Sequence, residues 1–204
     1  MVRTRQVDEA KIVRVAYRLF RQRGIHSTTL QQVVRACNAR SADIHLIFKS
    51  KHELVLAVIR YAVNRKMIHL SIASSLAPSA IAELRNFLQF VDETLTTLGA
   101  GVLDELAKDH RLTLDQLQDL VDDRMMPYLK KNIKRGLSEG FYRKGLNAEL
   151  HAATYFYLLR TLLESRRGWT RTRKIVAHFN DIFFYGVLNV KGMQVHGVTW
   201  ERKY

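Results

Sequence analysis

The chain of 204 residues is 47% hydrophobic and 25% charged, with only two prolines and 10 glycines, which excludes disordered, collagen-like and linker-rich proteins. Its length suits one large domain or two small ones. The single cysteine, Cys37, cannot form an internal disulfide, and no uninterrupted apolar run approaches the roughly 18 residues of a membrane span. The first residues contain no apolar segment of a signal peptide, so we expect a cytoplasmic protein without membrane association.

Positive charge is concentrated in the first third of the chain. The formal net charge is +14, and residues 1–66 hold 14 Lys and Arg against four Asp and Glu, a local net charge of +10. The rest of the chain carries only +4. A polyanion is therefore the expected partner of the first third, with nucleic acid ahead of a membrane surface.

Apolar residues recur at helical spacing along the chain, whereas period-two strand patterns are scarce, which predicts an all-α fold. The first helix is expected to end at Gly24, a residue type favoured just past a helix C-terminus. Its predicted buried face consists of Ile12, Ala16, Leu19 and Phe20.

The second helix begins at one of two overlapping capping boxes, which start at Thr28 and Thr29 and place a glutamine three residues later. The sequence leaves open which threonine caps the helix. Asn38 follows the helix, and asparagine tolerates the left-handed conformation that a tight turn needs. A third helix over residues 41–48 is short, because Ser50 and Glu53 form the capping box of a fourth helix.

The later helices are less sharply bounded by the sequence. Pro78 is expected to end the fourth helix after about 25 residues, and Gly99 and Gly101 to separate the next two. A capping box that starts at Thr113 predicts a longer helix, which Pro127 should kink. Helices near residues 148–165 and 171–189 follow, and the tail from residue 192 is expected to be irregular.

Three short helices with a turn at Asn38 are the pattern of a helix-turn-helix. Three segments, without a gap across about 45 residues, resemble the DNA-binding domain of TetR-family transcriptional regulators. They are residues 12–24, the Thr28–Thr29 pair with residues 33–39, and residues 44–54. Residues 134–143, followed by Leu146 and Asn147, are similar to a stretch before that family's penultimate helix. The resemblance implies a helix-turn-helix domain over residues 1–52 and a helical effector-binding and dimerisation domain over residues 53–204.

The resemblance also implies a set of DNA-contacting residues. In a recognition helix placed in the major groove, Arg40 is expected to bind guanine, Asp43 to accept from cytosine, and Ser41 to contact a base or a phosphate. His45 stands where the family commonly has a phosphate-binding tyrosine. The full expected set is Thr28, Thr29, Arg40, Ser41, Ala42, Asp43, His45, Leu46 and Lys51, with Arg3 and Arg5 as a minor-groove arm.

Other interpretations of these residues stay open. Arg40 and Asp43 are three residues apart and could instead pair with each other on a solvated helix face. Ile44, Ile47 and Phe48 are expected in the core. Cys37 is interpreted as a small buried hydrophobic residue, because nothing near it in the sequence lowers the thiol pKa.

The function that these features favour is a dimeric, ligand-responsive regulator, expected to be a repressor, that binds palindromic double-stranded DNA and is released by a small-molecule effector. An alternative is a helical module that has lost sequence-specific DNA binding and acts through a protein or small-molecule partner. A helical enzyme is a weaker third option, since no HExxH, Walker, GxGxxG, GxSxG or CxxC motif occurs in the sequence. The only candidate for a metal site is the acidic cluster of Asp104, Glu105, Asp109 and His110. We expect no enzyme activity, no cofactor and no metal.

Overall fold

A computed structural model describes residues 8–108, 118–164 and 169–195, with the backbone alone for residues 97–108 and 169. Across these ranges the backbone is helical apart from turns and one isolated bridge between Tyr142 and Leu188, which confirms the all-α fold. The chain forms two compact units, Met1–Arg65 with Thr97–Gln118, and Lys66–Thr96 with Asp119–Tyr204. The sequence places a functional boundary at residue 52, which stays a prediction.

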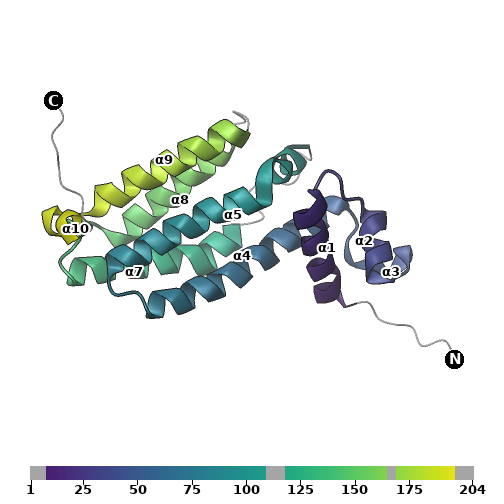
Figure 1. Cartoon of the computed structure of the whole chain (residues 1–204), viewed down its shortest axis with the longest axis horizontal. Helices are drawn as coiled ribbons and strands as arrows, with labels where there is room; N and C mark the ends of the chain where they lie inside the picture. Colours follow the sequence, from purple (N-terminus) through teal and green to yellow (C-terminus); the bar gives the residue numbers. More distant parts are fainter. Residues whose placement is uncertain (1–7, 109–117, 165–168, 196–204) are drawn as a thin grey trace. The chain divides into compact units, whose positions relative to one another are not determined.

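The first unit contains three short helices near the N-terminus, drawn in purple and blue in Figure 1: α1 (Glu9–Arg23), α2 (Leu30–Cys37) and α3 (Ser41–Ile47). The Asp8 side chain caps α1 by accepting the Ala10 N–H at 3.0 Å. Gly24 ends α1 with φ of 81°, as predicted from its residue type. Ile12, Ala16, Val33 and Ile44 are fully buried, so the three helices share one core.

The helix α4 (Lys51–Ser75) follows, and its length of 25 residues confirms the sequence prediction. The Ser50 hydroxyl accepts the Glu53 N–H at 3.2 Å, whereas the Glu53 carboxylate accepts the N–H of Lys49 at 2.8 Å. The capping box is therefore present, with its return bond displaced by one residue from the expected Ser50 N–H.

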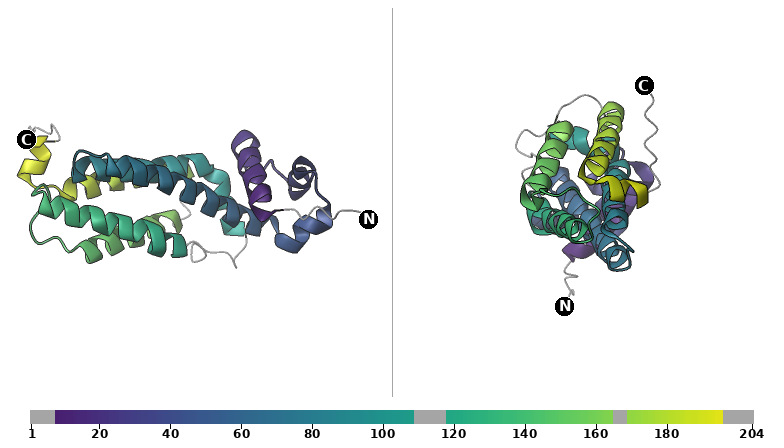
Figure 2. Two further views of the ribbon diagram at one scale, coloured as in Figure 1. Left: turned by 90° about the horizontal axis from the view of Figure 1, so that it is seen from below. Right: turned by 90° about the vertical axis from the view of Figure 1, so that its left-hand side faces the viewer.

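The second unit is built from the end of α4, the first part of α5 (Ala80–Lys108), and the helices that follow. A short α6 (Gln118–Leu120) leads through a π-helical turn (Val121–Met125) into α7 (Met126–Ser138). Then come α8 (Ala148–Glu164), α9 (Trp169–Val187) and α10 (Val190–Val195). The helix α7 packs on α8 and α8 on α9, and α8 and α9 lie side by side in both views of Figure 2.

Two of the sequence-based boundaries are wrong. The helix α5 continues through Gly99 and Gly101, because a single glycine in a helix interior costs only about 1 kcal/mol and long helices tolerate it. The expected irregular tail contains α10, in which the Asn189 side chain accepts the Gly192 N–H at 2.9 Å. The capping box at Thr113 lies outside the described residues.

The helix is interrupted near Pro127, as predicted, but the interruption is not the simple kink that the sequence suggested. Proline has no N–H to donate, and it stands in the first turn of α7, where a helix needs none. The five residues before α7 form the π-helical turn, and the Met126 N–H bonds to the carbonyl of Val121, five residues back. The interruption is therefore a π-turn followed by a new helix start.

Aromatic rings fill the core of the second unit. Tyr155 is fully buried, and its ring stacks on Phe179 at 5.3 Å and packs against Phe183 at 4.7 Å between centroids. Its hydroxyl donates to the Asn180 side chain at 2.8 Å, so the one polar atom of the ring is satisfied. Burial raises the pKa of Tyr155, which keeps the phenol neutral.

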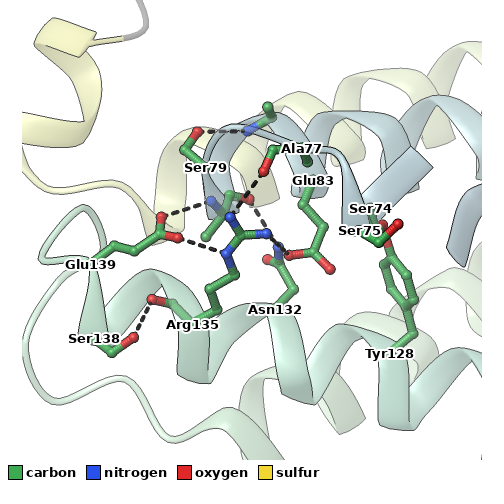
Figure 3. A network of polar contacts seen from close by, with 12 residues as sticks. Ser74, Ser75, Ala77, Ser79, Glu83, Tyr128, Asn132, Arg135, Ser138 and Glu139 are labelled. Carbon is green, nitrogen blue, oxygen red and sulfur yellow. Dashed lines mark hydrogen bonds and ion pairs between the residues drawn. The ribbon is translucent and has the colours of Figure 1, made fainter. Parts of the chain in front are cut away.

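A polar network centred on Arg135 holds the turn between α4 and α5 against α7 (Figure 3). The guanidinium donates to Glu139 at 2.6 Å, to the buried Glu83 at 3.2 Å, and to the Ala77 carbonyl at 3.0 Å. The second oxygen of Glu139 accepts the Ala80 N–H at 2.8 Å, which is one of the unpaired donors at the start of α5.

Beside this network, Tyr142 lies 1% exposed against Gly136 of α7. Its hydroxyl is 3.0 Å from the Ala80 carbonyl and 2.9 Å from the Asn132 side-chain oxygen. A Cβ atom at residue 136 would overlap the Tyr142 ring. Glycine is therefore required at 136 by close packing.

We predict that Gly136→Ala lowers the free energy of unfolding by about 1–3 kcal/mol, because the added methyl forces the Tyr142 ring and its hydroxyl out of place. Gly186→Ala in α9 is the matched control, since the nearest atom to its added Cβ is 3.9 Å away. Urea unfolding followed by circular dichroism measures both. Equal midpoints for the two variants would contradict the close contact.

Candidate nucleic-acid interface

The N-terminus of α2 is capped by Thr29, which settles the alternative that the sequence left open. The Thr29 hydroxyl oxygen accepts the Gln32 N–H at 3.2 Å, and the Gln32 side chain accepts the Thr29 N–H at 2.9 Å. Thr29 is exposed, and its hydroxyl hydrogen stays available to an acceptor outside the protein.

Thr28 differs from its neighbour in burial. Its side chain is 0% exposed, and its hydroxyl donates to the Gly24 carbonyl at 2.8 Å. The expectation that this side chain contacts DNA is therefore corrected, because its buried hydroxyl instead stabilises the turn between α1 and α2.

The turn between α2 and α3 has the geometry of a helix-turn-helix. Asn38 adopts φ of 51° and ψ of 48°, the left-handed conformation that its residue type predicts. Its N–H and that of Ala39 bond back to carbonyls in the last turn of α2. The Lys11 ammonium of α1 donates to the Cys37 carbonyl at 3.2 Å, so a cation also stabilises this helix C-terminus.

The short helix α3 has one buried face and one exposed face. Ile44 is 0% exposed and Phe48, which follows the helix, is 4% exposed, so both lie in the core as expected. Ile47, also expected in the core, is only half-buried. Ser41, Ala42, His45 and Leu46 are all exposed. The predicted DNA-contacting residues of α3 are thus brought together on one side of the helix, apart from Asp43, which is half-buried.

Arg40 and Asp43 form a two-pronged ion pair with each other. The guanidinium Nε and Nη2 atoms each donate to one carboxylate oxygen, both at 3.0 Å. Hydrogen bonding with Asp43 raises the pKa of Arg40. The Arg40 side chain is 71% exposed, so water screens this pair and Arg40 can exchange its partner.

Exposed basic side chains accompany these helices. They come from α1, from α2 and from the segment between α3 and α4: Arg14, Arg18, Arg21, Arg23, Arg35 and Lys49. Lys51 is half-buried at the start of α4. Arg3 and Arg5, the expected minor-groove arm, lie outside the described residues.

Cys37 is 2% exposed at the end of α2. Burial raises the pKa of its thiol, against a smaller lowering by the Lys11 ammonium, so the thiol is protonated at neutral pH. This confirms the interpretation of Cys37 as a buried hydrophobic residue. The Lys11 contact was not predicted, because the two residues are 26 positions apart and no local pattern joins them.

Among the described residues, no group of three His, Cys, Asp or Glu side chains is placed to hold a metal ion. The side chains of the Asp104, Glu105, Asp109 and His110 cluster are outside that part of the chain. In the same part, no helix combines the length and apolar character that crossing a membrane requires.

A shallow groove of about 300 Å³ lies between α5 and α9 of the second unit. Its walls combine apolar side chains such as Leu88 with the charged Asp92 and Asp181. The Arg85 guanidinium lies 5.7 Å from the centroid of the Phe184 ring, and both residues line the groove. The groove offers mixed apolar and charged contacts to a small molecule.

An exposed α3 held by a left-handed turn after α2, and surrounded by basic side chains, defines a helix-turn-helix protein of the DNA-binding class. Residues 12–58 match the model of the family described as bacterial regulatory proteins, tetR family. The uncharacterised HTH-type transcriptional regulator YerO of Bacillus subtilis (strain 168) is 32% identical over 57 residues. That alignment covers 28% of this chain and 20% of YerO.

Solved structures resemble the chain over most of its length. A transcriptional regulator from Cytophaga hutchinsonii has a TM-score of 0.66 at 15% identity, covering 87% of this chain and 97% of the other. FadR from Bacillus subtilis in complex with stearoyl-CoA has a TM-score of 0.59 at 13% identity, covering 88% and 100%. A Saccharomonospora viridis protein in complex with choline has a TM-score of 0.59 at 19% identity, covering 88% and 97%. These likenesses show the fold.

Residues 12–58 are therefore similar to the DNA-binding domain of TetR-family transcriptional regulators, and the chain shares the all-helical fold of the solved regulators. Members of this family are transcription factors without enzyme activity.

We predict that the Cys37 thiol of the native protein reacts with Ellman's reagent at least about 100-fold more slowly than in urea, because the thiol is buried and its pKa is raised. A matched control moves the cysteine by one residue, with Cys37→Ala combined with Ala36→Cys, since Ala36 is exposed. This control should react rapidly without urea. Rapid reaction of the parent protein would place Cys37 at the surface.

Proposed function

We propose that this chain is a dimeric, ligand-responsive transcriptional repressor that binds palindromic operator DNA through α3. The observation that carries the proposal is the exposed face of α3, whose opposite face is locked in the core by Ile44. A helix held in this way can enter the major groove without unfolding its own domain.

The phosphate contacts are assigned to side chains around α3. The Thr29 hydroxyl, His45 and Lys51 are each at the end of a helix or on the outward face, as phosphate-binding groups commonly are. Arg40 binds a guanine by giving up one of its two hydrogen bonds to Asp43, and breaking that bond costs little because the pair is exposed. Asp43 then accepts from a cytosine amino group or keeps its bond to Arg40. Thr28 is not part of this set.

Dimerisation is assigned to the outer faces of α8 and α9. Large apolar side chains are exposed there at helical spacing: Leu150, Tyr157 and Leu158 on α8, and Ile182 and Tyr185 on α9. Two neighbouring helices with such faces form a four-helix bundle with a second copy around a two-fold axis. Two-fold symmetry of the protein matches a palindromic operator.

The effector is assigned to the second unit. Two structural neighbours have small ligands, stearoyl-CoA in FadR and choline in the Saccharomonospora protein. In this chain, the groove between α5 and α9 offers a place for a small molecule. Effector and DNA would oppose each other through a coupling free energy of about 1–3 kcal/mol.

We expect the purified protein to bind the DNA upstream of its own gene about 10³-fold more tightly than a scrambled duplex of equal length, as measured by fluorescence anisotropy at several salt concentrations. Lys51→Ala should weaken binding and lower the salt slope by about 1, because it removes one of the proposed phosphate contacts. Lys131→Ala, on the exposed side of α7, makes the same charge change and should leave the slope unchanged. Equal effects of the two variants, or no preference for any DNA sequence, would refute the proposal.

We expect Ile182→Asp to convert the dimer to a monomer, because it places a charge in the centre of the proposed apolar interface. Ile68→Asp is the matched control: Ile68 on α4 is 62% exposed, close to the 58% of Ile182, but lies on no proposed interface. Light scattering after size-exclusion chromatography gives the mass of each. A monomeric parent protein, or a dimeric Ile182→Asp variant, would contradict the assignment.

A further inference from the structure

The outward face of α3 carries a pair of exposed apolar side chains. Leu46 is 83% exposed, more than any other large hydrophobic side chain of the described residues. Ala42 precedes it by one helical turn and is also exposed, so the two side chains are neighbours on the same face. The buried Ile44 lies on the other side of the helix and prevents the helix from rotating to cover Leu46.

The charged groups of this helix lie toward its N-terminal end. Arg40, which precedes the helix, donates to both carboxylate oxygens of Asp43 in its first turn. Only two polar side chains, Ser41 and His45, accompany the apolar pair on the exposed face. Apolar contact is therefore the chemistry that the centre of α3 offers to a base edge.

Thymine is the base that meets this chemistry. In the major groove it alone presents a methyl group, whereas the other bases present hydrogen-bonding groups that an apolar side chain would leave unsatisfied. We propose that Leu46, supported by Ala42, determines specificity by packing against a thymine 5-methyl group in each operator half-site. This inference rests on the proposed function and adds the base that the central part of α3 selects.

The surroundings of Leu46 favour DNA over a protein partner. An exposed leucine by itself is common on protein surfaces and implies no partner. Here the leucine is on a helix flanked by the exposed cations Arg35, Arg40 and Lys49, a charge pattern that complements phosphates. Apolar protein interfaces are depleted in charge at their core.

The test begins with selection of bound duplexes from a randomised pool by the full-length protein. Each thymine of the enriched sequence is then replaced in turn by deoxyuridine, which removes only the 5-methyl group. At one thymine per half-site we expect the dissociation constant to rise about fourfold, the effect of one buried methyl-sized group. Leu46→Ala should bind the thymine and deoxyuridine duplexes equally, whereas Leu46→Met, which keeps an apolar side chain of similar volume, should still discriminate.

Leu76→Ala serves as the control, because Leu76 is 79% exposed but lies beyond the end of α4, outside the helix-turn-helix. It should discriminate as the parent does. The inference is wrong if deoxyuridine at every thymine leaves the affinity of the parent protein unchanged. It is also wrong if the Leu46→Ala variant still discriminates between thymine and deoxyuridine. Either result leaves the proposed function intact. If the parent enriches no sequence at the selection step, the proposed function fails first, and the inference with it.

Discussion

The Arg135 guanidinium is the constraint on which the second unit depends. It is held by two carboxylates and a main-chain carbonyl, and the Glu83 carboxylate that it meets is 5% exposed. A buried carboxylate without a cation would be costly, so Arg135 and Glu83 require each other. Arg135 belongs to α7 and Glu83 to α5, so their ion pair joins these two helices. The bond from Arg135 to the Ala77 carbonyl adds the turn that precedes α5.

This pairing gives α4 a fixed end within the second unit. Ser74 near the C-terminus of α4 bonds to Tyr128 of α7, and Ala77 in the following turn accepts from Arg135. Desolvation raises the pKa of Tyr128 to about 12, so the phenol stays a neutral hydrogen-bonding group. The helix continues without interruption to Lys51, beside the helix-turn-helix in sequence. In the proposed repressor, α4 is therefore the element through which an effector-induced shift would reach the DNA-binding residues.

Local signals explain which parts of the fold could be predicted. The capping glutamine after Thr29, the left-handed Asn38 and the proline after α4 act within a few residues, and each is visible in the sequence. The helix boundary expected at Gly99 is wrong, because continuation of a helix depends on the whole of α5. The sequence did not predict α10, because its N-terminus is fixed by Asn189. The Asn189 side chain also donates to carbonyls 47 and 49 positions away in the sequence. Long-range contacts of this kind leave no local pattern.

The site was predictable in position but not in detail, for a related reason. Helix periodicity identifies the outward face of α3, yet it cannot tell that Thr28 is buried beside an exposed Thr29, since that depends on the Gly24 turn. Nor can it decide whether Arg40 faces DNA or Asp43. Basic residues spread over the first unit supply affinity for any duplex, because phosphates are the same in every sequence. In the proposed function, discrimination comes from Arg40 and the few side chains of α3, and the most exposed large hydrophobic side chain of the described residues, Leu46, belongs to this helix.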